Sequence, residues 1–590
     1  MPRRSFLVLF LLGALLAPVT AGAVRAAESA DPTAKLHDLF DREWEWRLKE
    51  DPEYATSVGR HEYDDRLTSG APEDLARRAE GTKGFLAELA GIATAQLAPD
   101  DQTSADVFRR QLEMRLADFE LGDDEMPINA DSGFHTGFAQ LPVNVPLATV
   151  RDVDNYLSRL EAWPTIVAQH IALMRRGVAR GFTVPKATLA GYEKTISAHV
   201  VEDPTQSVFW TPLDNLPATF PAPERDRLRT RGRAAVLRAI SGYRTFLDFY
   251  TNEYYPKART TLGASELPDG AAYYRQQIRK FTTLDLSPDQ IHRIGLAEVE
   301  RIGKEMQEVM KSTGFAGDMP AFLQFLRTDP RFYAKTPEEL LMRAAWIAKR
   351  MDGKLPSLFG RLPRTPYTVE PVPDHLAPKY TSGRYVEAPY GSTRPGIYWV
   401  NTFMLESRPL YNLPALTLHE SVPGHHLQGS LAQEMENLPN FRRHSYISAY
   451  GEGWGLYSEW LGLEAGFYTD PFANFGRLTY EMWRACRLVV DTGLHAMGWT
   501  RQQSIDYLAS HTALPLHECE TETDRYISWP GQALSYKLGE IQIKNLRRRA
   551  EQALGAQFDV RAFHDVVLGS GSVPLDVLER NVERWIAGQK

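Results

Sequence analysis

Apolar residues recur at helical spacing along most of the chain, with charged residues between them. In residues 34–44, for example, apolar positions return every three or four residues, which is the period of a helix with one buried face. The pattern predicts helices over residues 34–60, 71–93, 103–121, 153–180, 224–255, 287–310, 320–325 and 336–350. Ser287 is predicted to cap the N-terminus of its helix, and Pro164 is predicted to kink or break the helix that contains it. Residues 126–146, which contain Asn, Gly and three Pro, are predicted to form a long loop.

The pattern changes near residue 359. Segments 367–372, 383–388 and 396–401 are short, rich in β-branched and aromatic residues, and bounded by Gly and Pro. They predict a small β-sheet within residues 360–402. Helical periodicity returns over 413–435, 450–465 and 475–499. The predicted fold class is therefore mainly α, with one small sheet.

The stretches between these segments and the N-terminal residues indicate the domain organisation and the route of export. Because no long linker or internal repeat is present, residues 28–590 are predicted to form one helical domain, with two lobes as an alternative. Residues 1–27 combine two Arg, an apolar run over 6–17 and small residues at 21–23, which predicts an ordinary secretory or a twin-arginine export signal. No Cys lies near the cleavage site, so we expect a periplasmic or extracellular protein without a stable membrane anchor.

Composition excludes further classes. A net charge of −8 and a pI near 6.1 argue against a nucleic-acid-binding protein. The only two cysteines, Cys486 and Cys519, exclude a disulfide scaffold; they either pair after export or are two small buried residues. The oligomeric state is left open.

The candidate chemistry lies in residues 416–428, where three His and one Glu fall within eight residues. These are His419, Glu420, His425 and His426. Neutral imidazoles hold a zinc ion, and a carboxylate beside them takes a proton from the metal-activated water. The segment therefore predicts a hydrolytic zinc site.

The spacing differs from H-E-x-x-H, because the position four residues after His419 is Pro423. On an unbroken helix, His426 would return to about 20° from His419 but lie ~10 Å along the axis, and His425 would point about 120° away. Pro423 and Gly424 are predicted to introduce a kink or π-bulge that returns either His425 or His426 to the metal.

This motif, together with Gly451-Glu-Gly-Trp-Gly-Leu-Tyr-Ser-Glu459, resembles the bacterial family DUF885. That family is similar to the zincin metallopeptidases and, more distantly, to thimet oligopeptidase, neurolysin and angiotensin-converting enzyme. The resemblance covers the C-terminal third and implies a deep cleft in a helical body that binds one Zn²⁺ ion, with Glu452 as the third ligand. Glu459 lies about two turns further along the same helix face and is expected to orient a ligand His.

The resemblance also suggests substrate contacts. In zincins an edge strand beside the metal helix pairs with the substrate backbone, which points to residues 396–401, including Asn401, with Tyr390 and Arg394 in the loop before them. A purely structural hairpin is the alternative. In residues 518–540, Tyr536 matches a Tyr that donates to the tetrahedral oxyanion, and Arg525 stands where those enzymes have a His.

Further polar candidates follow from the residues themselves. Gln532 and Lys537 lie beside Tyr536 and are candidates for substrate binding. In the predicted helix 475–499, Arg487, Asp491 and His495 share one face, which is either a surface strip or a buried polar network lining the cleft. In the second case Arg487 and His495 would bind substrate, and Asp491 would support a ligand or form a second metal site with His495.

These observations predict a zinc-dependent hydrolase, most consistent with a peptidase that cleaves short peptides with Glu420 as the general base. A metal-dependent amidase or esterase acting on a non-peptide substrate would use the same residues. A non-catalytic periplasmic peptide-binding protein is the other alternative.

Overall fold

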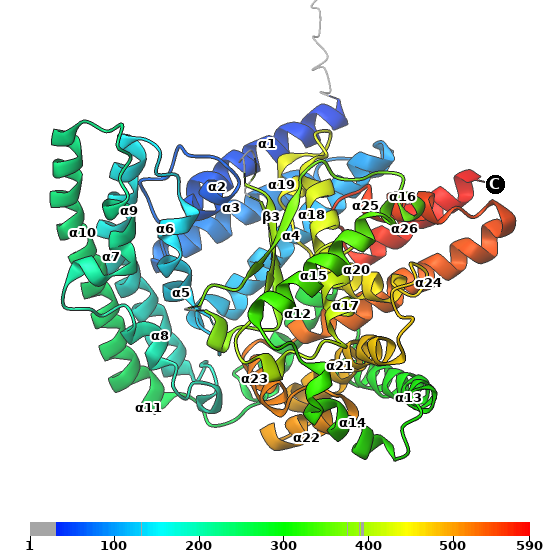
Figure 1. Cartoon of the computed structure of the whole chain (residues 1–590). Helices are drawn as coiled ribbons and strands as arrows, with labels where there is room; N and C mark the ends of the chain where they lie inside the picture. The colour runs from blue at the N-terminus through cyan, green and yellow to red at the C-terminus, as the bar shows by residue number, and fades with distance from the viewer. Residues whose placement is uncertain (1–30, 131, 375, 389, 391–393, 590) are drawn as a thin grey trace, which may run out of the picture.

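The computed structural model of the protein describes residues 31–130, 132–374, 376–388, 390 and 394–589. Over this part of the chain most residues are helical, and three short strands form one sheet (Figure 1). The predicted mainly α fold class with a small β-sheet is thus confirmed. The predicted export signal, residues 1–27, lies outside the described residues.

The first group of helices builds a core around the N-terminal amphipathic helix. It comprises α1 (Pro32–Glu50), α2 (Pro52–Ser57), α3 (Pro72–Ala90) and α4 (Pro99–Leu121). The apolar stripe of α1 is buried, and Phe40 meets Phe108 of α4 edge to face with ring centroids 5.0 Å apart. The helical period seen in residues 34–44 therefore marks a core-facing surface.

The long helices α7 (Val150–Arg180) and α10 (Ala222–Phe249) pack along each other at one side of the molecule (Figure 1). Helix α7 continues through Pro164, so a break at this residue is wrong. Its buried face packs along α10, which offsets the one hydrogen bond that proline removes. Shorter helices complete this group, two of them within the predicted loop 126–146: α5 (Phe134–Ala139), α6 (Leu141–Asn144), α8 (Glu193–Ser197), α9 (Thr211–Asp214) and α11 (Tyr255–Lys257).

The remaining helices lie within residues 270–589, and one of them, α21, is buried along nearly its whole length. The predicted cap of α13 is confirmed, since the Ser287 side chain accepts a hydrogen bond from the Gln290 N–H. The helices are α12 (Gly270–Thr282), α13 (Pro288–Ser312), α14 (Met319–Thr328), α15 (Pro337–Asp352), α16 (Leu355–Leu358), α17 (Leu413–Glu420), α18 (His425–Gln433), α19 (Asn440–Arg443), α20 (Ser448–Leu461), α21 (Pro471–Ala496), α22 (Arg501–His511), α23 (Leu516–Ser528), α24 (Ser535–Leu554), α25 (Val560–Leu568) and α26 (Leu575–Gln589).

The three strands are β1 (Tyr367–Pro371), β2 (Gly383–Val386) and β3 (Gly396–Val400), in the order β1-β3-β2. Strand β3 pairs in parallel with β1 and antiparallel with β2. The expectation that residues 396–401 offer a free edge is therefore wrong, because both sides of β3 are already paired. Strand β2 is an edge strand of the sheet and contacts α17.

A cavity of about 1610 Å³ lies between the α7 side and the C-terminal helices. It is lined from α2, α4 and α7 on one side and from β2, α17, α18, α21, α23 and α24 on the other. Both Cys486 and Cys519 are buried and free. Among the described helices, none combines the length and the apolar character needed to cross a bilayer.

Candidate metal centre

A break between two short helices brings His425 beside His419. Helix α17 ends at Glu420 and α18 begins at His425, so the four residues between them leave the helix entirely, rather than forming a kink or π-bulge. Gly424 packs so closely that a Cβ there would lie 1.9 Å from the His419 carbonyl oxygen. The two imidazole rings meet nearly at right angles, with centroids 4.8 Å apart.

Three potential ligand atoms converge at this point. Glu452 Oε2 lies 3.5 Å from His419 Nε2 and 3.4 Å from His425 Nε2, and the ligand atoms of all three residues lie within 4.8 Å of one another. For ligand–zinc distances of about 2.0–2.1 Å, the ligand atoms of a tetrahedral site are about 3.3–3.4 Å apart. Two imidazoles and one carboxylate at this spacing fit a zinc ion.

His426 lies outside this group. Its Nδ1 is 3.1 Å from the Tyr385 hydroxyl and 3.3 Å from the Ser430 hydroxyl, and its ring packs against Tyr367. Burial lowers the pKa of His426 to about 4. Of the two histidines that the spacing left open, the structure therefore places His425 with the other ligand candidates.

A second layer of polar groups orients these side chains. Glu459 Oε1 accepts a hydrogen bond from His419 Nδ1 at 2.8 Å, which leaves the Nε2 lone pair available as a ligand on the side of Glu452. Tyr446 donates to the other oxygen of the Glu452 carboxylate at 2.9 Å. Sequence reasoning anticipated Glu459 but missed Tyr446, whose position before the Gly-Glu-Gly motif carries no metal-site signal.

The electrostatics of the group favour a bound cation. Burial lowers the pKa of His419, but the hydrogen bonds to Glu452 and Glu459 and the charge of Glu420 raise it to about 10. Burial raises the pKa of Glu452, yet the two histidines hold it well below its usual range. Several carboxylates thus create negative potential at the point where the two Nε2 atoms meet.

Glycines of α20 allow these groups to approach. A Cβ at Gly455 would lie 2.7–3.0 Å from three atoms of the His419 ring. A Cβ at Gly453 would lie 2.5 Å from Gly539 of α24, so α20 and α24 are in backbone contact there. The Gly-Glu-Gly-Trp-Gly motif therefore sets how closely α20 approaches both α17 and α24.

We expect Gly455→Ala to weaken zinc binding by about 10- to 100-fold, as the loss of an outer-shell partner does. The added methyl group would push the His419 ring away from the other ligands, because the ring contacts the α20 backbone directly. Titration calorimetry with zinc would measure the effect. Gly84→Ala is the control, since nothing lies within 4 Å of a Cβ at Gly84 of α3. Equal zinc affinity in both variants would contradict this account.

Glu420, the last residue of α17, lies beside the ligands and lines the cavity. Its Oε2 accepts a hydrogen bond from the backbone N–H of Tyr385 in β2 at 2.8 Å. Edge strand β2 thus fixes one oxygen of the carboxylate beside the candidate ligands.

Tyr536, at the start of α24, also lines the cavity, and its ring centroid lies 6.5 Å from that of His419. Its hydroxyl oxygen lies 3.4 Å from both Arg525 Nη2 and the Gln532 amide nitrogen. Since both groups donate, the phenol proton is left to point elsewhere. Burial and Glu452 raise the pKa of Tyr536, but Arg525, Arg487 and the Gln532 hydrogen bond outweigh them, so the pKa lies below its ordinary value.

Four of the seven predicted substrate-binding residues line the cavity: Tyr390, Arg394, Arg487 and Gln532. Asn401 does not, and its prediction as a substrate contact is wrong. It is fully buried, and its amide nitrogen donates to the carbonyl oxygens of Ala377, Tyr380 and Thr381. Its role is to hold the loop before β2.

Asp491 and His495 also lie away from the cavity. We therefore correct three predictions: the substrate contact of His495, the support of a ligand by Asp491, and a second metal site formed by both. Asp491 accepts hydrogen bonds from the Tyr274 hydroxyl at 2.6 Å and from the Gly531 N–H. Both His495 nitrogens contact backbone groups, and burial lowers its pKa to about 3. The two side chains fasten neighbouring segments to α21.

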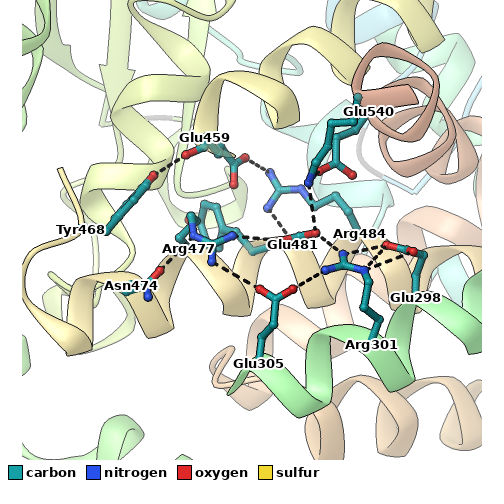
Figure 2. Close-up of polar contacts among 12 residues, drawn as sticks. Glu298, Arg301, Glu305, Glu459, Tyr468, Asn474, Arg477, Glu481, Arg484 and Glu540 are labelled. Carbon is teal, nitrogen blue, oxygen red and sulfur yellow. Dashed lines mark hydrogen bonds and ion pairs between the residues drawn. The ribbon is translucent and has the colours of Figure 1, made fainter. Parts of the chain in front are cut away.

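Lys537 is the third correction. It is buried and pairs with Glu481, Glu540 and Glu298 at 2.6–3.0 Å. Figure 2 shows the surrounding network, in which Arg477 and Arg301 reach Glu481 and Arg484 reaches Glu459. These ion pairs compensate the buried charges, so Lys537 is not available to a substrate.

Comparisons with known proteins place the chain in a wider group. The sequence profile of the family described as "bacterial protein of unknown function" (DUF885) matches residues 52–582. The crystal structure of a lipoprotein candidate from Colwellia psychrerythraea is 29% identical, with a TM-score of 0.89 over 95% of this chain and 100% of that one. The structure of a lipoprotein candidate of unknown function from Shewanella oneidensis is 18% identical, with a TM-score of 0.70 over 93% and 99%, and shows the fold alone. No curated protein matches the chain.

Proposed function

The chain belongs to the bacterial protein family DUF885, and from this premise we propose that it is a zinc-dependent hydrolase that cleaves short peptides. One observation carries the proposal: the ligand atoms of His419, His425 and Glu452 converge, and the Glu420 carboxylate lies beside them in a wide cavity. The resemblance of the motif to zincin metallopeptidases supports the same reaction.

The ligand set is that of a catalytic site. Catalytic zinc sites use three protein ligands, whereas structural sites use four. When bound by His419, His425 and Glu452, zinc would supply Lewis-acid chemistry, polarising the scissile carbonyl and lowering the pKa of water.

Glu420 is the proposed general base. With one oxygen fixed by Tyr385 N–H, its carboxylate would take a proton from the water that attacks the carbonyl carbon and pass it to the amide nitrogen. The new C–O bond forms and the C–N bond breaks, which yields a carboxylic acid and an amine. A non-catalytic peptide-binding protein has no use for this carboxylate.

Tyr536 is the proposed oxyanion donor. Because Arg525 and Gln532 donate to its oxygen, the hydroxyl proton can be directed at negative charge that develops on the carbonyl oxygen. Edge strand β2 lines the cavity next to Glu420, and an extended peptide would add as a further strand to the part of this edge that Glu420 leaves open.

We propose that the protein acts outside the cytoplasm, in the periplasm or beyond. The support is the export signal that the sequence predicts in residues 1–27. The relative from Colwellia psychrerythraea, which is itself described as a lipoprotein candidate, is in keeping with this location.

The function is tested by incubating a mixed peptide library with the zinc-loaded protein and identifying the products by mass spectrometry. We expect cleavage that a chelator abolishes and added zinc restores. Zinc binding without peptide cleavage would favour a non-peptide amide or ester substrate. Neither zinc binding nor cleavage would refute the proposed site.

We expect Tyr536→Phe to lower kcat by about 10²- to 10³-fold, the usual effect of losing one oxyanion donor. KM and zinc affinity should change little, because the ring stays and no ligand is lost. Steady-state kinetics on a peptide found in the library would measure this. Tyr255→Phe on α11, outside the cavity lining, is the control, and an equal kcat in both variants would exclude Tyr536 as the donor.

A further inference from the structure

Building on the proposed peptidase function, we infer that Arg384 binds a carboxylate of the substrate close to the scissile amide. We assign this carboxylate to the free C-terminus of the peptide. The preferred substrates would then be peptides cut one or two residues before their C-terminal end.

Arg384 is placed by the edge strand. It lies in β2 directly before Tyr385, whose N–H holds Glu420, and neighbouring residues of a strand are about 3.3 Å apart. Successive side chains alternate between the faces of a strand. Tyr385 is directed toward His426, so Arg384 points to the other face, where its side chain is exposed in the cavity.

Among the described residues the Arg384 guanidinium forms no ion pair or hydrogen bond with a carboxylate, and it lies over the face of the Tyr380 ring, 5.5 Å from the ring centroid. The neighbouring guanidinium groups differ in this respect. Arg487 and Arg525 share Glu522 at 2.9 and 3.4 Å, and Arg484 lies 3.6 Å from Glu459. A cation that lines a cavity without a counter-charge is a site for an anionic ligand group.

The part of the cavity wall around Arg384 carries a net positive charge. Arg384, Arg487 and Arg525 line it, and the last two share the buried Glu522 behind them. Glu518 adds less than a full negative charge near neutral pH, because burial raises its pKa to about 7. The metal side, in contrast, is rich in carboxylates.

Arg384 is also within electrostatic reach of the reacting groups. Burial lowers its pKa and Tyr380 raises it, while the charges of Arg525, Glu420 and Tyr536 act on it in addition, and the net effect is a raised pKa. Since Arg384 directly precedes Tyr385, whose N–H holds Glu420, a carboxylate bound here would sit near the general base. In an extended peptide, a reach of about one or two residues from the scissile bond is roughly 3–7 Å, which suits a C-terminal carboxylate.

The first test compares each peptide with its C-terminal amide. We expect the zinc-loaded wild-type protein to cleave the free acid with a kcat/KM about 10- to 100-fold higher, the usual range for a charge-assisted contact. Arg384→Gln should remove this preference by slowing the free acid alone. Arg293→Gln, on the exposed face of α13 and outside the cavity lining, should keep it. Equal rates for acid and amide in the wild type would overturn the proposal.

A second arm separates the two sources of a carboxylate. Amidated peptides with Glu or Gln after the scissile bond are compared in the same assay. A preference for Glu in the amides, lost in Arg384→Gln, would overturn the assignment to the C-terminus in favour of an acidic side chain. No difference between Glu and Gln, together with a preference for the free acid, would support the assignment.

A measurement of peptide binding tests the carboxylate site without relying on catalysis. Titration calorimetry on zinc-loaded Glu420→Gln would compare a free-acid peptide with its amide, with and without Arg384→Gln. Tighter binding of the acid that depends on Arg384 would support the carboxylate site even if no peptide were ever cleaved. Equal binding of acid and amide beside normal hydrolysis would overturn this inference and leave the proposed function standing.

Discussion

Glu420→Gln is expected to abolish peptide hydrolysis while leaving zinc binding intact. The amide keeps the size and shape of the side chain, but it cannot take a proton from water at neutral pH. Loss of a positioned general base costs about 10²- to 10⁴-fold in rate. We expect kcat/KM to fall within or beyond that range.

The structure explains why zinc should remain. Glu420 does not belong to the converging group of His419, His425 and Glu452, and the Tyr385 N–H can still donate to the amide oxygen of a Gln. Steady-state kinetics on a library-derived peptide and zinc content by atomic absorption would measure the two properties separately.

The matched control is Glu436→Gln, an exposed carboxylate beyond the end of α18. It should keep both zinc and activity. A Glu420→Gln protein that retains full activity would exclude Glu420 as the base, and one that loses zinc would mean that this carboxylate helps to hold the ion.

The second large effect concerns two adjacent histidines. His425→Ala should weaken zinc binding more than about 100-fold, beyond the roughly 10- to 100-fold cost of losing an outer-shell partner. His426→Asn should leave zinc affinity nearly unchanged, because its ring faces Tyr385, Ser430 and Tyr367. Titration calorimetry on the pair would measure this difference.

The pair is its own control, since both residues begin the same helix and both changes remove an imidazole. Thermal unfolding of the metal-free proteins would show whether either variant is misfolded. The reverse order, with zinc lost in His426→Asn and kept in His425→Ala, would contradict the geometry described for the break between α17 and α18.

Much of the fold could be predicted because it depends on local pattern. The stripe of α1, the Ser287 cap of α13 and the three strands all follow from residue period and from the chemistry of neighbouring residues. The types of side chain at the candidate metal centre could also be predicted, since several His and a Glu around a helix interruption are typical of a metal site.

The order of the strands in the sheet could not be predicted from the sequence. Strands β1 and β3 are parallel and enclose β2 in sequence but not in space. Segment 396–401 reads locally like any short strand, and only pairing on both of its sides makes it central. The edge strand near Glu420 is therefore β2, the strand that contains Arg384.

Which polar side chains reach the cavity was likewise decided by tertiary packing. His495, Asp491 and Lys537 lie on helices whose polar faces turn inward, where Ala264, Tyr274 and Glu298 from distant segments satisfy them. Tyr446 reaches Glu452 for the same reason.

The sequence by itself determined the helical character, the sheet and the residue types of the candidate centre, because each depends on neighbours within a few positions. Only the tertiary structure placed His425, and not His426, beside His419 and Glu452, and separated the cavity-lining residues from the buried ones. The physical reason is that the direction in which the chain leaves the break after Glu420, and the partners available to a buried charge, depend on contacts between residues far apart in sequence.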